Sequence, residues 1–174
     1  MQDHETFVYP VAPTVDQIDD YNGVAVADPY RPLEDADDAA TRAWVEAENR
    51  LTRDYLASVR ERDTILDRLT QLWDYERFGI PMRRGGRYFF TRNDGLQNQA
   101  VLYTCRSLDE EPVILLDPNG LSQDGTVALA GWVPSEDGRY LAYGLAAGGS
   151  DWNEWRIREI ETGRDLDDRL AWVK

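Results

Sequence analysis

The stretch SEDGRYLAYGLAAGGSDW, residues Ser135 to Trp152, joins a tight turn to a strand and then to a second, polar turn. Gly138 follows Asp137, and glycine readily adopts the positive φ that a tight hairpin turn requires. The five residues after this turn, RYLAY, are rich in aromatic side chains that favour strands. The stretch therefore predicts a hairpin in an antiparallel sheet.

The same alternation of strands and turns runs through the second half of the chain. Strands are predicted at residues 88–92, 100–105, 113–116, 127–133, 139–145 and 155–160. Turn residues such as Asn-Asp-Gly, Pro-Asn-Gly and Asp-Gly separate nearly all of them. Reversals about every ten residues, without helical stripes between them, indicate an all-β meander of the kind that forms propeller blades. At roughly 40 to 50 residues per blade, the chain after about residue 77 supplies about two blades.

The first part of the chain, up to about residue 75, predicts an extended arm, a loop and two helices. The arm contains Pro10 and Pro13, and in the following loop Pro29 and Pro32 disfavour regular structure. We expect Asp35 or Asp37 to cap the first helix. The apolar faces of the helices are predicted from spacings of three and four: Ala40, Ala43, Trp44, Ala47, Leu51 and Tyr55 in the first, and Ile65, Leu66, Leu69, Leu72 and Trp73 in the second, at about residues 61–73.

The composition indicates a folded protein with an acidic surface. Of the 174 residues, 42% are hydrophobic and 30% charged, and 33 acidic against 19 basic residues give a net charge of −14. This charge disfavours nucleic acid and anionic membrane as partners, because both would repel the chain. A high-salt habitat is an alternative explanation for the acidity. No apolar stretch approaches the length of a membrane span and no secretory signal is visible, so we expect a cytoplasmic location.

Residues for independent catalysis are missing from the sequence. The single histidine, His4, lies in the N-terminal tail, and no Gly-x-Ser-x-Gly elbow occurs. Ser150 is interpreted as a turn residue, because Trp152 stands where the second glycine of that elbow would be. The lone Cys105 is expected to be a buried strand residue, and adjacent acidic pairs are expected to be solvated or capping. No spacing predicts a metal site or a cofactor.

Several motifs in order along the chain resemble the N-terminal part of prolyl oligopeptidases. They are DPYRPLED (28–35), GLQNQ (95–99), LDPN (116–119), DGTVAL (124–129) and GSDW (149–152). The resemblance runs from about Tyr9 to Trp152. Two positions depart from it: Pro32 stands where tryptophan is expected, and Glu48 where glutamine is expected.

The resemblance implies an α+β fragment in which an N-terminal helical segment leads into an incomplete β-propeller, seven-bladed in the family. Residues 1–76 would be the arm and helices that pack on the family's α/β-hydrolase domain, and residues 77–174 the first blades. That hydrolase domain is absent here, and its catalytic Ser, Asp and His would lie beyond Lys174. The chain is then expected to be an incomplete piece of a larger enzyme.

For the intact protein, the resemblance implies a serine endopeptidase that cleaves short peptides after proline, with the propeller restricting access. It also places Asp151 near the cavity between propeller and hydrolase domain, where it could pair with a cationic residue of the substrate site. From the residues alone, Asp151 could equally form an Asx turn before Trp152. The expected partners are short proline-containing peptides and the hydrolase domain.

Two alternatives remain open from the sequence. The chain could be a non-catalytic peptide-binding module, or an orphan fragment without activity, and a binding module would require an exposed concave patch of Tyr and Trp. A related oligopeptidase that cleaves after basic residues shares the architecture, but the GLQNQ, LDPN and GSDW motifs favour the prolyl enzyme.

Overall fold

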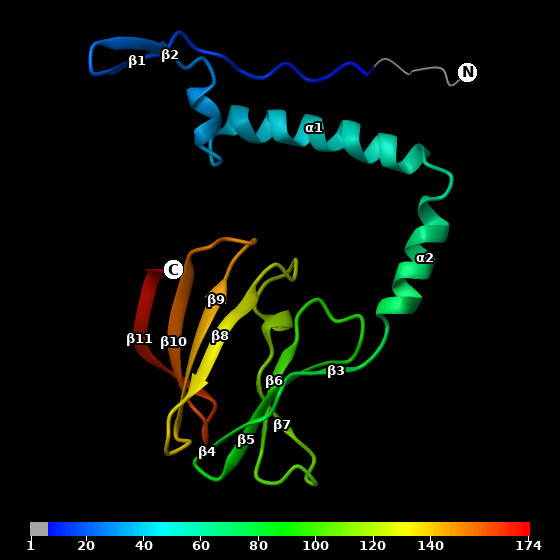
Figure 1. Cartoon of the computed structure of the whole chain (residues 1–174), viewed down its shortest axis with the longest axis vertical. Helices are drawn as coiled ribbons and strands as arrows, with labels where there is room; N and C mark the ends of the chain where they lie inside the picture. Colours follow the sequence, from blue (N-terminus) through cyan, green and yellow to red (C-terminus); the bar gives the residue numbers. More distant parts are fainter. Residues whose placement is uncertain (1–6) are drawn as a thin grey trace. The chain divides into compact units, whose positions relative to one another are not determined.

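The computed structural model describes residues 7–174, which form two compact units, one up to Asp67 and one from Arg68 to Lys174 (Figure 1). In chain order the elements are β1 (Ile18–Tyr21), β2 (Val24–Ala27), the 3-10 helix η1 (Arg31–Glu34), α1 (Ala39–Ser58), α2 (Arg62–Trp73), β3 (Arg77–Phe78), β4 (Met82–Arg84), β5 (Arg87–Asn93), β6 (Val101–Cys105), β7 (Val113–Leu116), the 3-10 helix η2 (Pro118–Gly120), β8 (Ala128–Pro134), β9 (Tyr140–Ala146), β10 (Asn153–Glu159) and β11 (Arg164–Val173).

A β-hairpin and a 3-10 helix occupy the region predicted to be an irregular loop. Asn22 and Gly23 both have positive φ, 57° and 88°, which is the backbone of the tight turn that joins β1 to β2. Pro32 lies inside η1, where the missing N–H of proline costs nothing at the start of a helix. The expectation that these prolines exclude regular structure is therefore wrong for Pro32.

Helix α1 is capped by Asp38, which corrects the prediction of Asp35 or Asp37. The Asp38 carboxylate accepts hydrogen bonds from the backbone N–H groups of Ala40 (2.7 Å) and Thr41 (3.1 Å). Asp35 instead accepts from the N–H of Asp37 in the preceding turn. The cap thus lies one residue beyond the predicted candidates, where the chain turns from extended to helical φ and ψ.

The N-terminal arm packs along α1. The indole N–H of Trp44 donates to the carbonyl of Pro10 at 3.4 Å, and the ring of Phe7 meets Tyr55 edge to face at 5.3 Å. Thr41, near the start of α1, is buried and its hydroxyl donates to the Pro32 carbonyl at 3.1 Å. The arm and η1 thus cover part of the predicted apolar face of α1.

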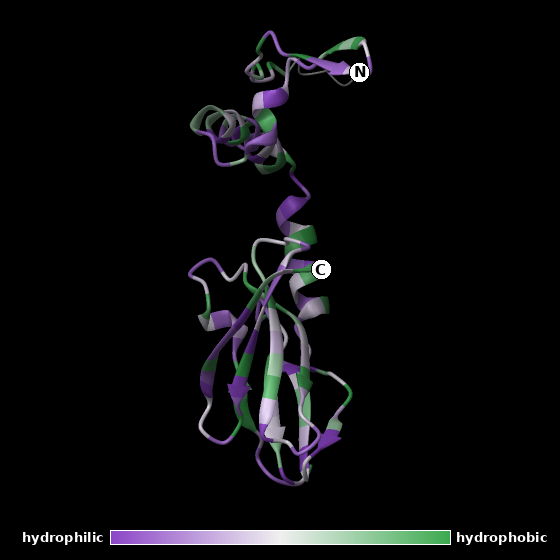
Figure 2. Ribbon diagram, turned by 90° about the vertical axis from the view of Figure 1, so that its left-hand side faces the viewer, coloured by the Kyte–Doolittle hydropathy of each residue, from purple (hydrophilic) through white to green (hydrophobic). Residues whose placement is uncertain are grey.

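The apolar stripe of α2 has formed as predicted but is not buried. Its five apolar side chains, Ile65, Leu66, Leu69, Leu72 and Trp73, are each about half exposed. Hydrophobic and hydrophilic stretches alternate along the helices (Figure 2). The stripe is therefore a packing surface without full cover in residues 7–174.

The strands of the second unit form two antiparallel meanders. β3 and β4 both pair with β5, from Arg77 opposite Asn93 to Arg84 opposite Arg87, so they act as one interrupted edge strand. The first sheet therefore runs β3/β4, β5, β6, β7, and the second runs β8, β9, β10, β11. Each is a four-position meander, as expected for a propeller blade. All six predicted strands are present as β5 to β10.

Strand β11 completes the second sheet beyond the last predicted strand. It pairs antiparallel with β10, starting with Glu159 opposite Arg164. Five of its ten residues are Asp or Arg and nearly all of it is exposed, so its hydropathy resembles that of a loop. A solvated edge strand with many charges is a common protection against unwanted pairing.

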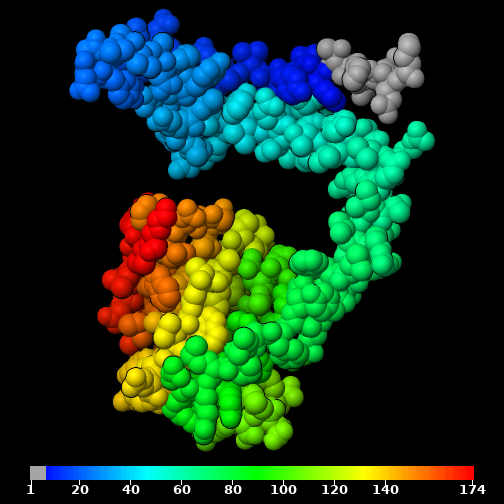
Figure 3. All heavy atoms as spheres, viewed as in Figure 1, coloured from blue at the N-terminus to red at the C-terminus, as the bar shows by residue number. Residues whose placement is uncertain are grey.

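The hydrophobic core lies between the two sheets. Its buried members come from both: Phe89, Leu102, Leu115 and Leu116 from the first sheet, and Leu141, Tyr143 and Ile160 from the second sheet and the turn after β10. The atoms of the two sheets, green and yellow to red, are in direct contact in Figure 3. The sheets therefore stabilise each other through one shared core.

The two sheets also meet at their turns, which explains a pair of glycines. Gly85 in the β4–β5 turn lies so close to Asp137 that a Cβ there would be 2.1 Å from the Asp137 carbonyl oxygen. Its N–H donates to the carbonyl of Glu136 at 3.0 Å. Gly138, with φ of 70°, forms the predicted Asp-Gly turn on the other side. Glycine at both positions lets the two backbones touch.

Candidate functional site

The loop between β9 and β10, residues 147–152, carries the predicted site residue Asp151. Gly148 and Gly149 have φ of 57° and 76°, and the Ser150 N–H donates to the Ala147 carbonyl at 3.0 Å. The Ser150 hydroxyl accepts from the backbone N–H of Trp152 at 3.1 Å. Ser150 is thus a turn residue, as predicted, and the Asx turn at Asp151 stays a prediction.

Asp151 is available for an ionic contact. Its side chain is largely exposed, and its carboxylate lies 3.6 Å from the ammonium group of Lys174. The C-terminus and the β9–β10 loop lie at the same end of the second sheet (Figure 1). The carboxylate therefore faces a cation supplied by this chain. Its contact with a substrate-site cation stays a prediction.

Two tryptophans lie next to this ion pair. The ring of Trp152 meets that of Trp172 edge to face, with centroids 5.9 Å apart and planes at 69°. The Lys174 ammonium lies 5.7 Å from the centroid of Trp152, within the range of a cation–π contact. Trp152 and Trp172, hereafter the tryptophan pair, thus form an aromatic surface flanked by one negative and one positive group.

Sequence reasoning missed Trp172 and Lys174 as neighbours of Asp151. Trp172 lies at the end of β11, which the sequence did not identify as a strand, and Lys174 is the residue that follows this strand. A Trp-x-Lys sequence carries no signal of its own. The number of strands in a blade could have found them. A four-stranded blade requires one more strand after β10, and an antiparallel strand there ends beside the β9–β10 loop.

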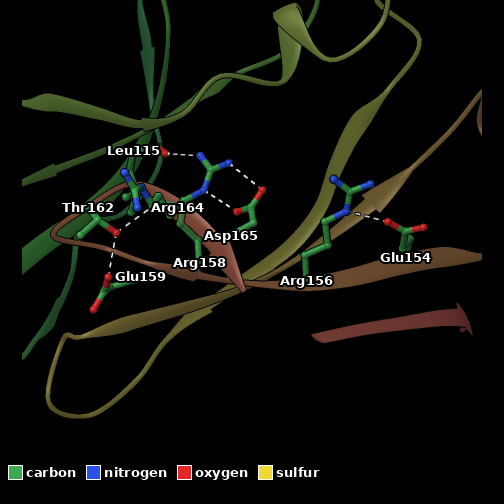
Figure 4. A network of polar contacts seen from close by, with 8 residues as sticks. All are labelled: Leu115, Glu154, Arg156, Arg158, Glu159, Thr162, Arg164 and Asp165. Carbon is green, nitrogen blue, oxygen red and sulfur yellow. Dashed lines mark hydrogen bonds and ion pairs between the residues drawn. The ribbon is translucent and has the colours of Figure 1, made fainter. Parts of the chain in front are cut away.

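A polar network fixes the second sheet on the first (Figure 4). The guanidinium of Arg158, on β10, makes two hydrogen bonds to the carboxylate of Asp165, at 2.7 and 3.1 Å, and donates to the backbone carbonyl of Leu115 at 2.8 Å. On the same strand, Arg156 donates to Glu154 at 2.6 Å. Arg158 thus links β10 to β11 within its sheet and to β7 of the neighbouring sheet.

The protonation of this network follows from its contacts. Burial alone would raise the pKa of Asp165, but hydrogen bonds from Arg158 and Tyr143 and the positive charges of Arg158 and Arg156 outweigh it and lower the pKa. Burial, together with the Asp165 carboxylate, raises the pKa of the Tyr143 phenol. Asp165 is therefore held as a carboxylate and Tyr143 as a neutral phenol at neutral pH, which suits a structural clamp.

A polar cavity of about 370 Å³ lies at the other end of β9, between the turns of the two sheets. Its charged lining residues are three arginines and three acids: Arg87, Arg106, Arg139, Asp137, Glu159 and Glu161. Arg87 and Glu161 form an ion pair across it. Positive and negative side chains are thus balanced, so the cavity shows no preference for a ligand of one charge.

The other candidate residues show no reactive arrangement. Cys105 is buried, as predicted, and burial raises the pKa of its thiol, so it is kept as the unreactive neutral form. His4 lies outside the described residues, and residues 7–174 contain no histidine that could activate a hydroxyl. In the same range, no three His, Cys, Asp or Glu side chains are grouped to hold a metal ion. Neither described helix is long and apolar enough to cross a membrane.

The comparisons with known proteins agree with this architecture. The family model for the N-terminal β-propeller domain of prolyl oligopeptidase matches residues 10–174. A prolyl endopeptidase of Elizabethkingia meningoseptica is 40% identical over 99% of this chain and 24% of its own length. A prolyl oligopeptidase of Omphalotus olearius is 37% identical over 88% of this chain and 24% of its own length. The chain thus spans about a quarter of the length of these curated relatives.

Solved structures give the same result. The structure of a prolyl endopeptidase superposes with a TM-score of 0.78 and 32% identity, covering 94% of this chain and 24% of that one. Prolyl oligopeptidase B from Galerina marginata, bound to a 35-residue hydrolysis and macrocyclisation substrate, superposes with a TM-score of 0.72 and 25% identity over 96% and 27%. With two sheets of blade topology and a match over nearly its whole length, the chain belongs to the prolyl oligopeptidase family and represents its N-terminal β-propeller region.

Proposed function

We propose that the full-length protein containing this chain is a serine endopeptidase that hydrolyses short peptides on the carboxyl side of proline. The observation that carries this proposal is the match to the family's propeller domain over residues 10–174. It is supported by relatives named prolyl endopeptidases at 40% and 39% identity. In this proposal the propeller blades restrict access, so that peptides enter and folded proteins do not.

The chemistry of cleavage would reside outside this chain. Acyl transfer requires an activated nucleophile, a base and a group that stabilises the oxyanion. Residues 7–174 contain no histidine. The role proposed for this chain is therefore access and binding, with the catalytic Ser, Asp and His supplied by the rest of the protein.

A direct test compares two lengths of the protein. We expect the full-length protein to release a chromogenic group from a Gly-Pro reporter and a serine-directed inhibitor to abolish this activity. The 174-residue chain alone is the matched control and should show no turnover. Absence of cleavage by the full-length protein, or inhibitor-sensitive cleavage by the short chain, would contradict the proposal.

Asp151 is proposed to face the substrate cavity. Its carboxylate is exposed and already within 3.6 Å of a cation, which supports a role in pairing with a positive group. In the full-length protein, Asp151→Asn keeps the shape but removes the charge. We expect a lower kcat/KM for a proline-containing peptide, whereas an unchanged kcat/KM would remove this role.

A further inference from the structure

Four of the motifs that carry the family resemblance lie at one end of the two sheets. GLQNQ (95–99) lies between β5 and β6, LDPN (116–119) ends β7 and begins η2, DGTVAL (124–129) leads into β8, and GSDW (149–152) lies between β9 and β10. In the first sheet, Leu102 near the start of β6 is opposite Leu116 at the end of β7. In the second, Ala128 at the start of β8 is opposite Ala146 at the end of β9. Hydrogen bonds join these loops in an order that ends at the loop of Asp151.

The first two loops are joined through Asn119 and Gln99. The Asn119 side chain accepts a hydrogen bond from the backbone N–H of Gln99 at 2.9 Å and donates one to the Gln99 carbonyl at 3.0 Å. Asn119 is itself held by Asp117, whose carboxylate accepts from the backbone N–H (2.9 Å) and the side-chain amide (2.8 Å) of Asn119. Both polar backbone groups of Gln99 are thus bonded to one side chain, which fixes where the Gln99 side chain begins.

The Gln99 side chain reaches the segment that leads into β8. Its amide donates to the carbonyl of Gly125 at 3.3 Å. Gly125 has φ of 69°, and a Cβ there would be 2.3 Å from the side-chain nitrogen of Asn98, so this backbone lies directly against the β5–β6 loop. On the next residue, the Thr126 carbonyl accepts from the N–H of Gly148 at 3.3 Å. One hydrogen-bonded path therefore runs from Gln99 to the β9–β10 loop.

The β9–β10 loop has little support of its own. Its residues 147–152 are exposed, and two of them are glycines with positive φ. The hydrogen bonds of Ser150 within the loop span only two and three residues. Loops with few buried contacts and exposed hydrogen bonds open at a low cost in free energy. The bond from Gly148 to Thr126 therefore bears directly on where the Asp151 carboxylate lies.

We propose that Gln99 is a positioning residue for Asp151, acting through residues 125–126 and the β9–β10 loop. This inference rests on the role proposed for Asp151 in the substrate cavity. A charged group recognises its partner well only when it is held within about 0.5 Å of the required geometry, and residues outside the site supply that restraint. The contact of Asp151 with Lys174 supplies little of it, because exposed ion pairs are weak.

The experiment uses the full-length protein and a matched pair of glutamines. Gln99→Met keeps the length of the side chain and removes the donor to the Gly125 carbonyl. Gln97→Met is the control, because Gln97 belongs to the same motif and is also partly buried, but its side chain accepts from the Asp94 N–H at 3.2 Å, within its own loop. We expect kcat/KM for a proline-containing peptide to fall about three- to tenfold with Gln99→Met and to stay within about twofold with Gln97→Met.

A double-mutant cycle with Asp151→Asn separates positioning from a purely structural role. If Gln99 acts through Asp151, Gln99→Met should change kcat/KM by less than about twofold once Asp151→Asn is present, because no charge is left to position. If Gln99 only stabilises the fold, the two effects should multiply. Multiplied effects would overturn the inference, as would equal losses for Gln99→Met and Gln97→Met.

A second variant covers the case in which Gln99→Met does not fold. Gln99→Glu keeps the shape of the side chain, but its carboxylate cannot donate to the Gly125 carbonyl. It should reproduce the loss in kcat/KM and the dependence of that loss on Asp151. A Gln99→Glu protein with unchanged kcat/KM would contradict the positioning role.

Hydrogen–deuterium exchange tests the positioning without any reaction. In the full-length protein, the fragment covering residues 147–152 should exchange about three- to tenfold faster with Gln99→Met, and at an unchanged rate with Gln97→Met. An unchanged rate with Gln99→Met would end the inference. If exchange becomes faster but Asp151→Asn leaves kcat/KM unchanged, the role proposed for Asp151 fails, and the positioning of its loop by Gln99 stands.

Discussion

The helices and the strands of this chain handle the same kind of apolar residue differently. In the sheets, Phe89, Leu102 and Leu141 are fully buried. In α2, Leu66 and Leu69 lie on a regular apolar stripe and remain about half exposed. The difference is that the apolar faces of two sheets bury each other, whereas the apolar face of a single helix is buried only if another element packs on it. Within residues 7–174, stability should therefore come mainly from the sheets.

The largest effect is expected from the shared core of the sheets. Phe89 is 0% exposed, so Phe89→Ala should lower the free energy of unfolding of the chain by about 3 to 5 kcal/mol, because it leaves a cavity. Phe78 is 59% exposed, and Phe78→Ala should cost about 1 kcal/mol or less. Urea unfolding followed by tryptophan fluorescence measures both.

If Phe89→Ala does not fold, Phe89→Leu removes less volume and keeps the comparison measurable. Equal losses for the two phenylalanines would contradict the conclusion that the core lies between the sheets.

The next effect concerns the Arg158 clamp between the two sheets. Arg158 and Asp165 side chains are 17% and 31% exposed, and Arg158 also bonds the Leu115 carbonyl. Arg158→Met leaves the Asp165 carboxylate without its partner and should lower the free energy of unfolding by about 1.5 to 3 kcal/mol. Arg53, which pairs with Glu46 on the exposed face of α1, is the control. Arg53→Met should cost less than about 0.5 kcal/mol. Similar costs for the two would show that the clamp is an ordinary surface pair.

The clamp also predicts how stability depends on pH. The pKa of Asp165 in the folded chain is below its ordinary value of 3.8, despite its burial, because Arg158 and Tyr143 bond its carboxylate. A group with a lowered folded pKa stabilises the fold above its unfolded pKa, and this contribution is lost as the pH falls through the folded pKa. Unfolding free energy should therefore be flat between about pH 5 and 6 and decline below about pH 4.

Asp165→Asn is the test of this pH dependence. It removes the titrating group, so the decline below about pH 4 should be shallower in the variant than in the original chain, as measured by urea unfolding at several pH values. An identical decline in both would assign the acid sensitivity to other carboxylates, such as Asp137, whose pKa is lowered by hydrogen bonds from Ser135 and from the Arg139 N–H.

Sequence reasoning predicted the elements whose signal is local. Strand-favouring residues and turn residues about every ten positions identified β5 to β10, and the spacing of Leu66, Leu69 and Trp73 identified α2. It missed β11, because a charged edge strand has no apolar alternation, and it missed the β1–β2 hairpin, whose Asn22-Gly23 turn was a readable signal. The GSDW motif singled out Asp151 as a candidate, but Lys174 and Trp172 reach it only through the pairing of β10 with β11, which sequence alone does not specify.

The smallest effect is expected on α2, and it sharpens the contrast between helices and strands. Leu69 is 54% exposed, so Leu69→Ala should change the unfolding free energy of the 174-residue chain by less than about 0.5 kcal/mol. If the stripe of α2 docks on the remainder of the full-length protein, Leu69→Ala leaves a buried cavity there and should lower the free energy of unfolding by about 2 kcal/mol or more. Thermal or urea unfolding of both lengths, with and without the substitution, measures the difference. Equally small effects in both lengths would mean that nothing in the whole protein covers the stripe, and the exposed leucines would then need another explanation.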